Sequence, residues 1–473
     1  MTALPAELLQ AVATPGGGRI ALVLGAGCSV EPPTSVPVSR NCALEIHRRL
    51  VADGILQEGD CPNPYDLSLV ADAVFSKRHS QRDVVERFRD QYDLKTAPPN
   101  DGYKIAAAML CEGVITSVVT LNFDLAISHA VVDLGVGLIV GIVEGPYDLP
   151  KQRNVNVYYL HRNVNATDVE TWVLRTAILQ EDWKRHWQAI IATKVLVAPV
   201  VVFAGLGTPV AVLVESTKLL REALPQTTKL YQVDPGEYAN SKFFEALQID
   251  PSAYIQRGWC QLMEELSERL STEHIAQLQR AVGQKTIQDH LQTEDVSSLL
   301  NRLGSLGIVT FGKIRALWLL HDRPYRRVDA DGLSLIADLL LALGTIMRVS
   351  GTAAVILEDG HIEFRYQDRI VAGFLIASGC GHRGKAAVEA AVESRRGRYR
   401  TLPDPPRAVF VGGTADIWTT QPTSPRDIVQ GELKAEDIIT GPTSLPLHHI
   451  TELRSNPDLI RKLVPLPVTQ EVR

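Results

Sequence analysis

The chain has 473 residues, of which 45% are hydrophobic and 22% charged, and its formal net charge is −6 at pH 7. This composition predicts a globular protein of two domains, and the weak negative charge gives no global attraction to nucleic acid. No apolar run reaches the roughly 18 to 20 residues of a membrane span, and the first residues lack the basic start and apolar core of a signal peptide, so we expect a cytoplasmic protein.

The first predicted strand covers residues 20–24 and ends in a glycine turn, Gly25-Ala26-Gly27-Cys28-Ser29, ahead of a helix that begins near Arg40. The order of strand, glycine turn and helix is typical of the first βα unit of a doubly wound sheet. There the main chain can approach a pyrophosphate and direct N–H groups at it. Many tight turns of this kind bind nothing, so this stretch alone leaves both interpretations open.

Helices are predicted from residue 41 to about 111, with breaks at 61–64 and 97–100, and we interpret them as an insertion or cover. A β-rich run over 114–121 follows, and it ends in the segment Thr120-Leu121-Asn122-Phe123-Asp124. The next residues predict a helix closed by Gly135. A further strand over 155–160 leads directly to His161.

Residues 194–204 form an almost continuous apolar run, as expected of a central parallel strand buried on both faces. It ends in Gly205-Leu206-Gly207-Thr208, and a short strand over 230–233 ends at Asp234. Because the carboxyl ends of parallel strands meet at one edge, we expect these polar ends to line one crevice, where such sheets bind ligands.

Asn122 and His161 are the candidate reactive residues of this crevice. A carboxamide can donate to and accept from a hydroxyl or water at once, and an imidazole can act as a base near neutral pH. The structural alternatives are a helix N-cap for Asn122 or Asp124 and a hydrogen-bonded histidine at a strand end for His161.

Taken in order, these motifs resemble the SIR2 (sirtuin) NAD-binding family in its bacterial SIR2-like form. The glycine turn is similar to the family's GAGxS loop, residues 120–124 to its T-x-N-x-D, and Leu160-His161 to its L-H. Residues 36–40 lie where the family has a proline and an arginine, and residues 205–208 resemble its adenosine-side loop. Residues 257–261, Arg-Gly-Trp-Cys-Gln, resemble its closing segment.

The resemblance implies roles for individual residues. Asn122 and His161 would be catalytic. The residues that would bind NAD are Gly25, Ala26, Gly27, Ser29, Arg40, Asp124, Gly205, Gly207, Thr208, Asp234 and Cys260.

Two departures from the family's pattern bear on the activity. Arg162 replaces the glycine that usually follows the histidine, and the four-cysteine zinc module of the protein deacylases is absent. The six cysteines are scattered without a CxxC pair, so we expect neither zinc nor disulfides. Without the zinc module an acyl-lysine substrate is disfavoured, which leaves NAD and water.

The resemblance therefore implies an NAD glycohydrolase, with NAD as substrate, that releases nicotinamide and ADP-ribose. It further implies a regulated, NAD-depleting effector of bacterial anti-phage defence. Such an effector would be a homo-oligomer, with a co-encoded partner such as a HerA-like ATPase or an Argonaute-type sensor. An NAD-dependent protein deacylase and a non-catalytic sensor that binds NAD or ADP-ribose are the alternatives.

The C-terminal half gives weaker signals. Polar helices are predicted over 271–303, an apolar helix over 329–349, and strands over 352–357, 361–366 and 370–377, with a hairpin turn at 358–360. We expect an α/β, Rossmann-like parallel sheet with helices on both faces over residues 1–272. A smaller α+β domain for regulation or assembly should follow over 273–473.

Three motifs in this half have both a functional and a structural interpretation. Residues 379–385 fit a phosphate loop, but Ala386 stands where a hydroxyl would hold Mg²⁺, and a tight turn explains the pattern as well. The cluster Arg395–Arg400 could bind nucleic-acid phosphates or be a solvated helix end. Glu432 and Lys434 form an E-x-K pair without an acidic partner upstream, and we treat them as surface residues.

Overall fold

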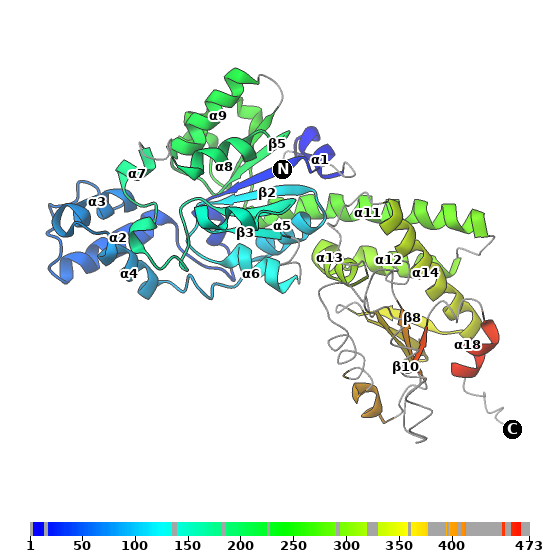
Figure 1. The fold of residues 1–473 in the computed structure, drawn as a ribbon. Helices are drawn as coiled ribbons and strands as arrows, with labels where there is room; N and C mark the ends of the chain where they lie inside the picture. Colours follow the sequence, from blue (N-terminus) through cyan, green and yellow to red (C-terminus); the bar gives the residue numbers. More distant parts are fainter. Residues whose placement is uncertain are drawn as a thin grey trace. The chain divides into compact units, whose positions relative to one another are not determined.

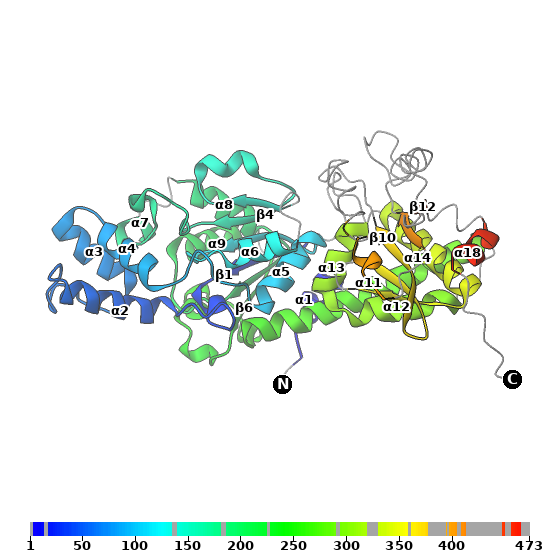
Figure 2. The same cartoon turned by 90° about the horizontal axis from the view of Figure 1, so that it is seen from below.

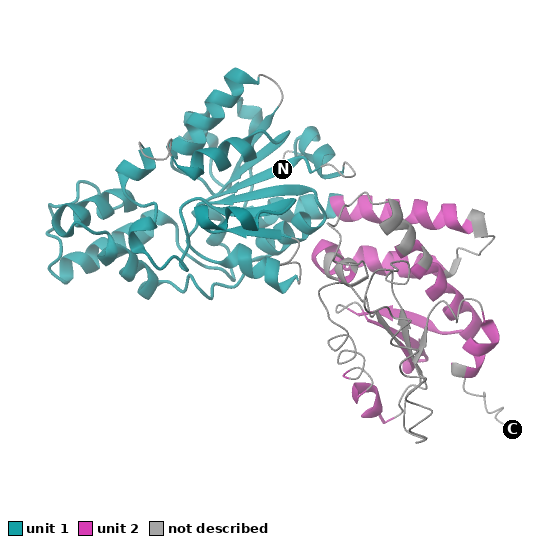
Figure 3. Cartoon of the chain, in the orientation of Figure 1, with its two compact units in different colours: residues 1–269 teal, residues 270–473 magenta. Residues whose placement is uncertain are grey.

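A computed structural model shows two compact units, residues 1–269 and 270–473 (Figure 3). The residues described are 3–13, 18–134, 140–180, 186–224, 228–289, 294–318, 330–357, 361–376, 394, 397–403, 408–412, 447–449 and 456–464. Each unit has its own sheet.

The first unit, whose strands β2, β3 and β5 are labelled in Figure 1, is built on a seven-stranded sheet. Its order is β3-β4-β2-β1-β5-β6-β7, and every neighbouring pair is parallel. This confirms the predicted Rossmann-like α/β class. The strands are β1 (Ile20–Leu24), β2 (Ile115–Thr120), β3 (Val140–Val143), β4 (Val155–Tyr159), β5 (Val200–Ala204), β6 (Lys229–Asp234) and β7 (Tyr254–Gln256).

Helices cover both faces of this sheet. On one face, alternate strand residues such as Val23 and Phe203 pack in a core with α8 (Trp187–Leu196), α9 (Ala211–Ala223) and α10 (Lys242–Leu247). The other face contacts α5 (Asp101–Cys111), which also packs against α6 (Ala126–Asp133). Strand β1 is buried along its whole length. Its five consecutive apolar residues therefore pack against the helices on both faces of the sheet.

A separate helical module lies to one side of the sheet in both views (Figures 1 and 2). It consists of α2 (Ser39–Ala52), α3 (Leu67–Arg78) and α4 (Arg82–Gln91), whose apolar faces share a core with residues of the segment 166–174. The predicted cover was therefore too long. Its last helix, α5, packs on the sheet instead, because almost its whole length is apolar and buried.

The predicted strand over 194–204 was also too long. Helix α8 continues to Leu196, and β5 begins only at Val200. Pro199 cannot continue a helix, which explains the break between them. The prediction missed it because a continuous apolar run looks the same in a buried helix end and in a strand. The short strands β3 and β7 and the N-terminal helix α1 (Ala6–Ala13) were not predicted. Gly135 lies outside the described residues.

Short 3₁₀ and helical segments complete this unit. They are η1 (Ala26–Ser29), η2 (Pro146–Lys151), η3 (Val169–Thr171), α7 (Thr176–Gln180), η5 (Tyr238–Asn240) and η6 (Pro251–Ala253). Helix α11 (Trp259–Asp289) begins in the first unit and continues into the second.

The second unit has a five-stranded mixed sheet in the order β12-β11-β10-β9-β8. Strands β8 to β10 are antiparallel neighbours, whereas β10, β11 and β12 are parallel. The strands are β8 (Ala353–Ile356), β9 (Ile362–Tyr366), β10 (Arg369–Ile376), β11 (Ala408–Gly412) and β12 (Leu447–His449). The helices are α12 (Glu294–Ser305), α13 (Gly307–Trp318), α14 (Ala330–Ser350) and α18 (Pro457–Leu463).

Most of the C-terminal motifs lie outside the described residues. This holds for the hairpin turn at 358–360, residues 379–385, Arg395, Arg396, Glu432 and Lys434. Of the arginine cluster, Arg398 and Arg400 are not buried, whereas Tyr399 between them is buried against Gly373 of β10. The tyrosine thus anchors this segment on the sheet and leaves the two arginines at the surface.

Candidate functional site

The loops after β2, β1 and β5 lie side by side at the carboxyl edge of the first sheet. Leu121 N donates to Leu24 O over 3.0 Å, and Gly25 N donates to Ala204 O over 2.9 Å. These hydrogen bonds extend the strand pairing into the loops. The edge therefore brings together three of the motifs that the sequence places far apart.

The glycine loops after β1 and β5 are in direct backbone contact. A Cβ added to Gly27 would lie 2.7 Å from the Cα of Gly205, and Gly205 itself has a left-handed φ of +67°. Gly27 N donates to Gly205 O and Cys28 N to Gly25 O, both over 3.0 Å. The N–H groups of Gly25, Gly27 and Cys28 are thus engaged within the protein, so a phosphate bound here would need other donors.

Asn122 is the centre of a buried hydrogen-bond network. Its Nδ2 lies 3.1 Å from Gly25 O, 3.0 Å from Ser29 Oγ and 3.0 Å from the Tyr103 hydroxyl. Ser29 Oγ in turn donates to Asp124 Oδ2 over 2.7 Å. The side chain of Asn122 is buried, and its Oδ1 has no hydrogen-bond partner among the described residues.

The local sequence explains how the segment after β2 holds this position. Asn122 N donates to Thr120 Oγ1 over 3.1 Å, which fixes the turn at the end of the strand. Asp124 Oδ1 accepts from Ala126 N over 3.1 Å at the start of α6. Asp124 therefore supports the start of α6, although the N-cap residue itself is Leu125, and it also takes part in the network. Burial raises the pKa of its carboxyl group above the ordinary value.

Tyr103 is a member of this network that the sequence did not reveal. It lies on α5, is 1% exposed, and its hydroxyl contacts both Ser29 Oγ (2.7 Å) and Asn122 Nδ2 (3.0 Å). Burial raises its pKa well above the ordinary value. The one signal in the sequence was a lone tyrosine in an alanine-rich helix, which is equally typical of a core residue.

His161 follows β4 and lies in an aromatic cluster. Its ring centroid is 6.4 Å from that of Phe123, which stacks on Trp172 at 4.5 Å. The residue keeps partial access to solvent, but it is set deep enough in the protein that desolvation lowers its pKa to about 4. The imidazole is therefore neutral at pH 7, and it is a weaker base than an ordinary histidine.

Arg162 has a backbone conformation that glycine favours. Its φ is +70°, in the left-handed region. Its Nη1 donates to Glu144 O over 2.8 Å, and its guanidinium occupies the space where a side chain on Gly145 would lie.

Four other predicted site residues have contacts or exposure of a different kind. Arg40 is exposed on α2, and its guanidinium lies over the ring of Tyr65 at 5.0 Å. Gly207 and Thr208 are exposed beyond the loop contact. The side chain of Asp234 accepts from Gly236 N over 2.8 Å and thereby closes a turn.

Cys260 lies at the start of α11 and contacts two residues near the site. Its N–H donates to the Glu31 carboxylate, and its Sγ accepts from Gly102 N over 3.4 Å. The start of α11 is thus tied to the start of α5, next to Tyr103. The NAD-binding roles of Cys260 and of the residues named above stay predictions.

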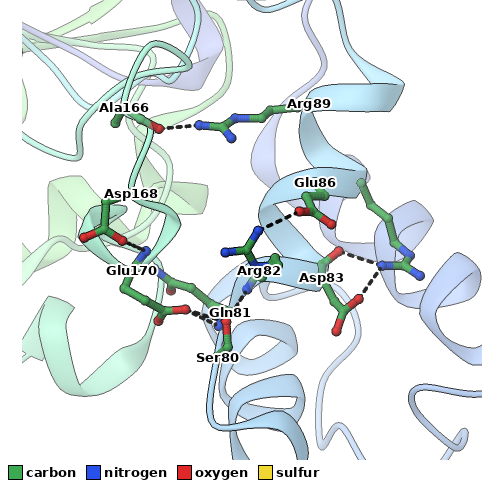
Figure 4. A network of polar contacts seen from close by, with 10 residues as sticks. Ser80, Gln81, Arg82, Asp83, Glu86, Arg89, Ala166, Asp168 and Glu170 are labelled. Carbon is green, nitrogen blue, oxygen red and sulfur yellow. Dashed lines mark hydrogen bonds and ion pairs between the residues drawn. The ribbon is translucent and has the colours of Figure 1, made fainter.

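The helical module is fastened to the segment that follows His161 (Figure 4). Buried Gln81 donates from Nε2 to Val169 O (2.7 Å) and Trp172 O (2.9 Å), and its backbone N–H donates to Glu170. Arg89 donates to Ala166 O in the same segment, and its guanidinium lies over the Trp172 ring. A movement of the module would therefore pull on the loop that begins at His161.

Among the described residues, no group of three or more His, Cys, Asp or Glu side chains could hold a metal ion. No helix in the described part of the chain is long and apolar enough to cross a membrane.

The fold and the strand-end cluster define an α/β protein of the doubly wound class. No protein-family model matches the sequence, and no curated protein matches it. Solved structures of Sir2 proteins are similar in fold. A complex of a mutant Sir2 homologue with ADP ribose is 14% identical with a TM-score of 0.36, and the match covers 57% of this chain and 97% of the other.

Two further structures match in the same way. A Sir2 homolog–NAD complex is 15% identical with a TM-score of 0.34, covering 56% of this chain and 93% of the other. A Sir2–p53 peptide–NAD+ structure has the same identity and score and covers 56% and 98%.

Proposed function

We propose that the first unit is an NAD glycohydrolase, which uses water to cleave NAD+ into nicotinamide and ADP-ribose. The observation that carries this proposal is Asn122 Oδ1, a buried acceptor without a partner in the described part of the chain, held at the carboxyl edge of a doubly wound sheet. A buried unpaired acceptor costs about 1–3 kcal/mol, so the site favours a ligand that donates a hydrogen bond there. A ribose hydroxyl or a bound water supplies that donor.

In the proposed reaction, water replaces nicotinamide at C1′ of the ribose. The bond between C1′ and the nicotinamide nitrogen breaks with its electron pair on nitrogen, and water forms the new C1′–O bond and loses a proton. The transition state resembles an oxocarbenium ion, as in glycoside cleavage. Asn122 positions the hydroxyl or water, and neutral His161 accepts the proton and passes it to solvent.

A sensor that binds NAD or ADP-ribose without cleaving it is the second candidate. The lowered pKa of His161, about 4, favours it, because so weak a base accepts a proton from water poorly at neutral pH. The two functions differ in one measurable product. Cleavage releases nicotinamide, whereas a sensor shows saturable binding and releases none.

We further propose that the protein acts as a regulated, NAD-depleting effector in anti-phage defence. The support is the motif resemblance together with a second unit of about two hundred residues that carries none of the site residues named above. In this proposal the second unit keeps the hydrolase inactive until the protein assembles with further copies of itself or with a partner. The second unit is the regulatory domain in this proposal.

The test is incubation of the purified full-length protein with NAD, with and without its co-encoded neighbour, while nicotinamide is measured. Release in either condition supports the hydrolase. Saturable NAD binding with no release in both conditions leaves the sensor, and absence of binding refutes both. Light scattering on the same samples tests the proposed oligomer.

A further inference from the structure

With the Asp124 carboxylate ionised, the Ser29 hydroxyl determines the direction of the neighbouring hydrogen bonds in the Asn122 network. Ser29 has a single hydroxyl proton, and it is donated to Asp124 Oδ2 over 2.7 Å. The 2.7 Å contact between Ser29 Oγ and the Tyr103 hydroxyl must then carry the proton of Tyr103. The two protons of Asn122 Nδ2 are then shared among three acceptors, Gly25 O, Ser29 Oγ and the Tyr103 oxygen, each at 3.0–3.1 Å.

These directions fix which end of the Asn122 carboxamide faces the protein. Gly25 O is a carbonyl and can only accept, so the group 3.1 Å from it must be Nδ2. In the flipped amide, Oδ1 would lie against the Gly25 carbonyl oxygen, and two acceptors would repel each other. The Tyr103 hydroxyl would also have to donate its single proton both to Oδ1 and to Ser29 Oγ. The open end of the amide is therefore an acceptor, and it selects a ligand group that donates.

Tyr103 is itself held rigidly against the same loop. Its backbone N–H donates to the Asn100 side chain over 3.1 Å, and the Asn100 Nδ2 donates to Cys28 O over 2.8 Å. Its ring packs on Trp259 with centroids 5.9 Å apart. The hydroxyl of Tyr103 thus has little freedom to leave its place between Ser29 and Asn122.

We propose that Tyr103 is a positioning residue that holds the Asn122 carboxamide with Oδ1 directed to a hydroxyl donor of the substrate. It acts through Asn122 and does not touch the reacting atoms. The catalytic part of this inference rests on the proposed NAD glycohydrolase activity. The orientation of the amide does not.

The test is Tyr103→Phe, which removes the hydroxyl and keeps the ring. The matched control is Tyr159→Phe, because Tyr159 is equally buried and shares a 2.8 Å hydroxyl contact with Ser128, outside the network. We expect Tyr103→Phe to lower kcat by roughly tenfold to a hundredfold with KM changed less than about threefold. Tyr159→Phe should lose similar stability and keep kcat.

A second measurement needs no ligand. The side-chain amide signals of Asn122 in ¹⁵N-labelled full-length protein are identified by their loss in Asn122→Ala. Their exchange with solvent should become at least about tenfold faster in Tyr103→Phe and stay unchanged in Tyr159→Phe.

Unchanged amide exchange in Tyr103→Phe would overturn the inference whether or not the protein cleaves NAD. Faster exchange with an unchanged kcat would overturn the positioning role. If the wild-type protein cleaves no NAD but the exchange is faster, the orientation of Asn122 by Tyr103 holds and the proposed function fails.

Discussion

Gly27 and Gly207 of the predicted site have very different surroundings. Substitutions at the two positions can therefore distinguish an effect on the stability of the fold from an effect on NAD binding. A Cβ on Gly27 would lie 2.7 Å from Gly205 Cα, a backbone atom that cannot move aside cheaply. A Cβ on Gly207 would meet no protein atom within 4 Å. We expect Gly27→Ala to destabilise the protein by about 1–3 kcal/mol through overpacking, and Gly207→Ala to change stability by less than about 0.5 kcal/mol.

The assay is thermal unfolding of both variants, followed by NAD titration in a calorimeter. For a unit of this size, the loss at Gly27 corresponds to a Tm lower by roughly 2–12 °C. Gly207→Leu should keep the wild-type Tm but weaken NAD binding, because its side chain would enter the space where the resemblance places adenosine. Wild-type stability of Gly27→Ala would refute the reasoning from loop contact. Unchanged NAD affinity in Gly207→Leu would remove this loop from the binding site.

Three further predictions concern the reaction centre and its support. Asn122→Ala and His161→Ala should each abolish nicotinamide release with an unchanged circular dichroism spectrum, and full activity of either would exclude the proposed mechanism. Because the folded state lowers the pKa of His161 from 6.5 to about 4, the unfolded chain binds a proton first as the pH falls. The free energy of unfolding should therefore decrease between pH 6.5 and 4, by at most about 3 kcal/mol, and urea titrations should show a flatter profile for His161→Ala. Gln81→Leu should cost about 1–3 kcal/mol, because it leaves two buried carbonyls without a donor; a Tm equal to wild type would show that the module is held otherwise.

The sequence was sufficient for the first sheet wherever the signal is local. Apolar runs that end in Gly, Asn or His marked β1, β2, β4 and β5, and the parallel topology then placed their ends at one edge. The strands β3 and β7, of four and three residues, were missed because so short a segment has no periodicity of its own. Their pairing with β4 and β6 is what makes them strands.

The composition of the site could not be predicted in the same way. Asn122 and Ser29 belong to motifs that are recognisable in the sequence. Tyr103 contacts these two residues only because α5 packs across β2 and β4. Nor does an exposed residue such as Arg40 reveal from sequence that it stacks on Tyr65. Long-range packing decides both cases, and a single sequence does not contain it in readable form.

The loop after His161 places a residue with a long side chain in the left-handed conformation, at Arg162. A left-handed conformation costs a residue with a side chain roughly 1–2 kcal/mol relative to glycine. Arg162 offsets part of this cost with its hydrogen bond to Glu144 O and by packing on Gly145. Position 145 has to stay small for the same reason, because a Cβ there would collide with the guanidinium. The conformation at position 162 therefore depends on the absence of a side chain at position 145.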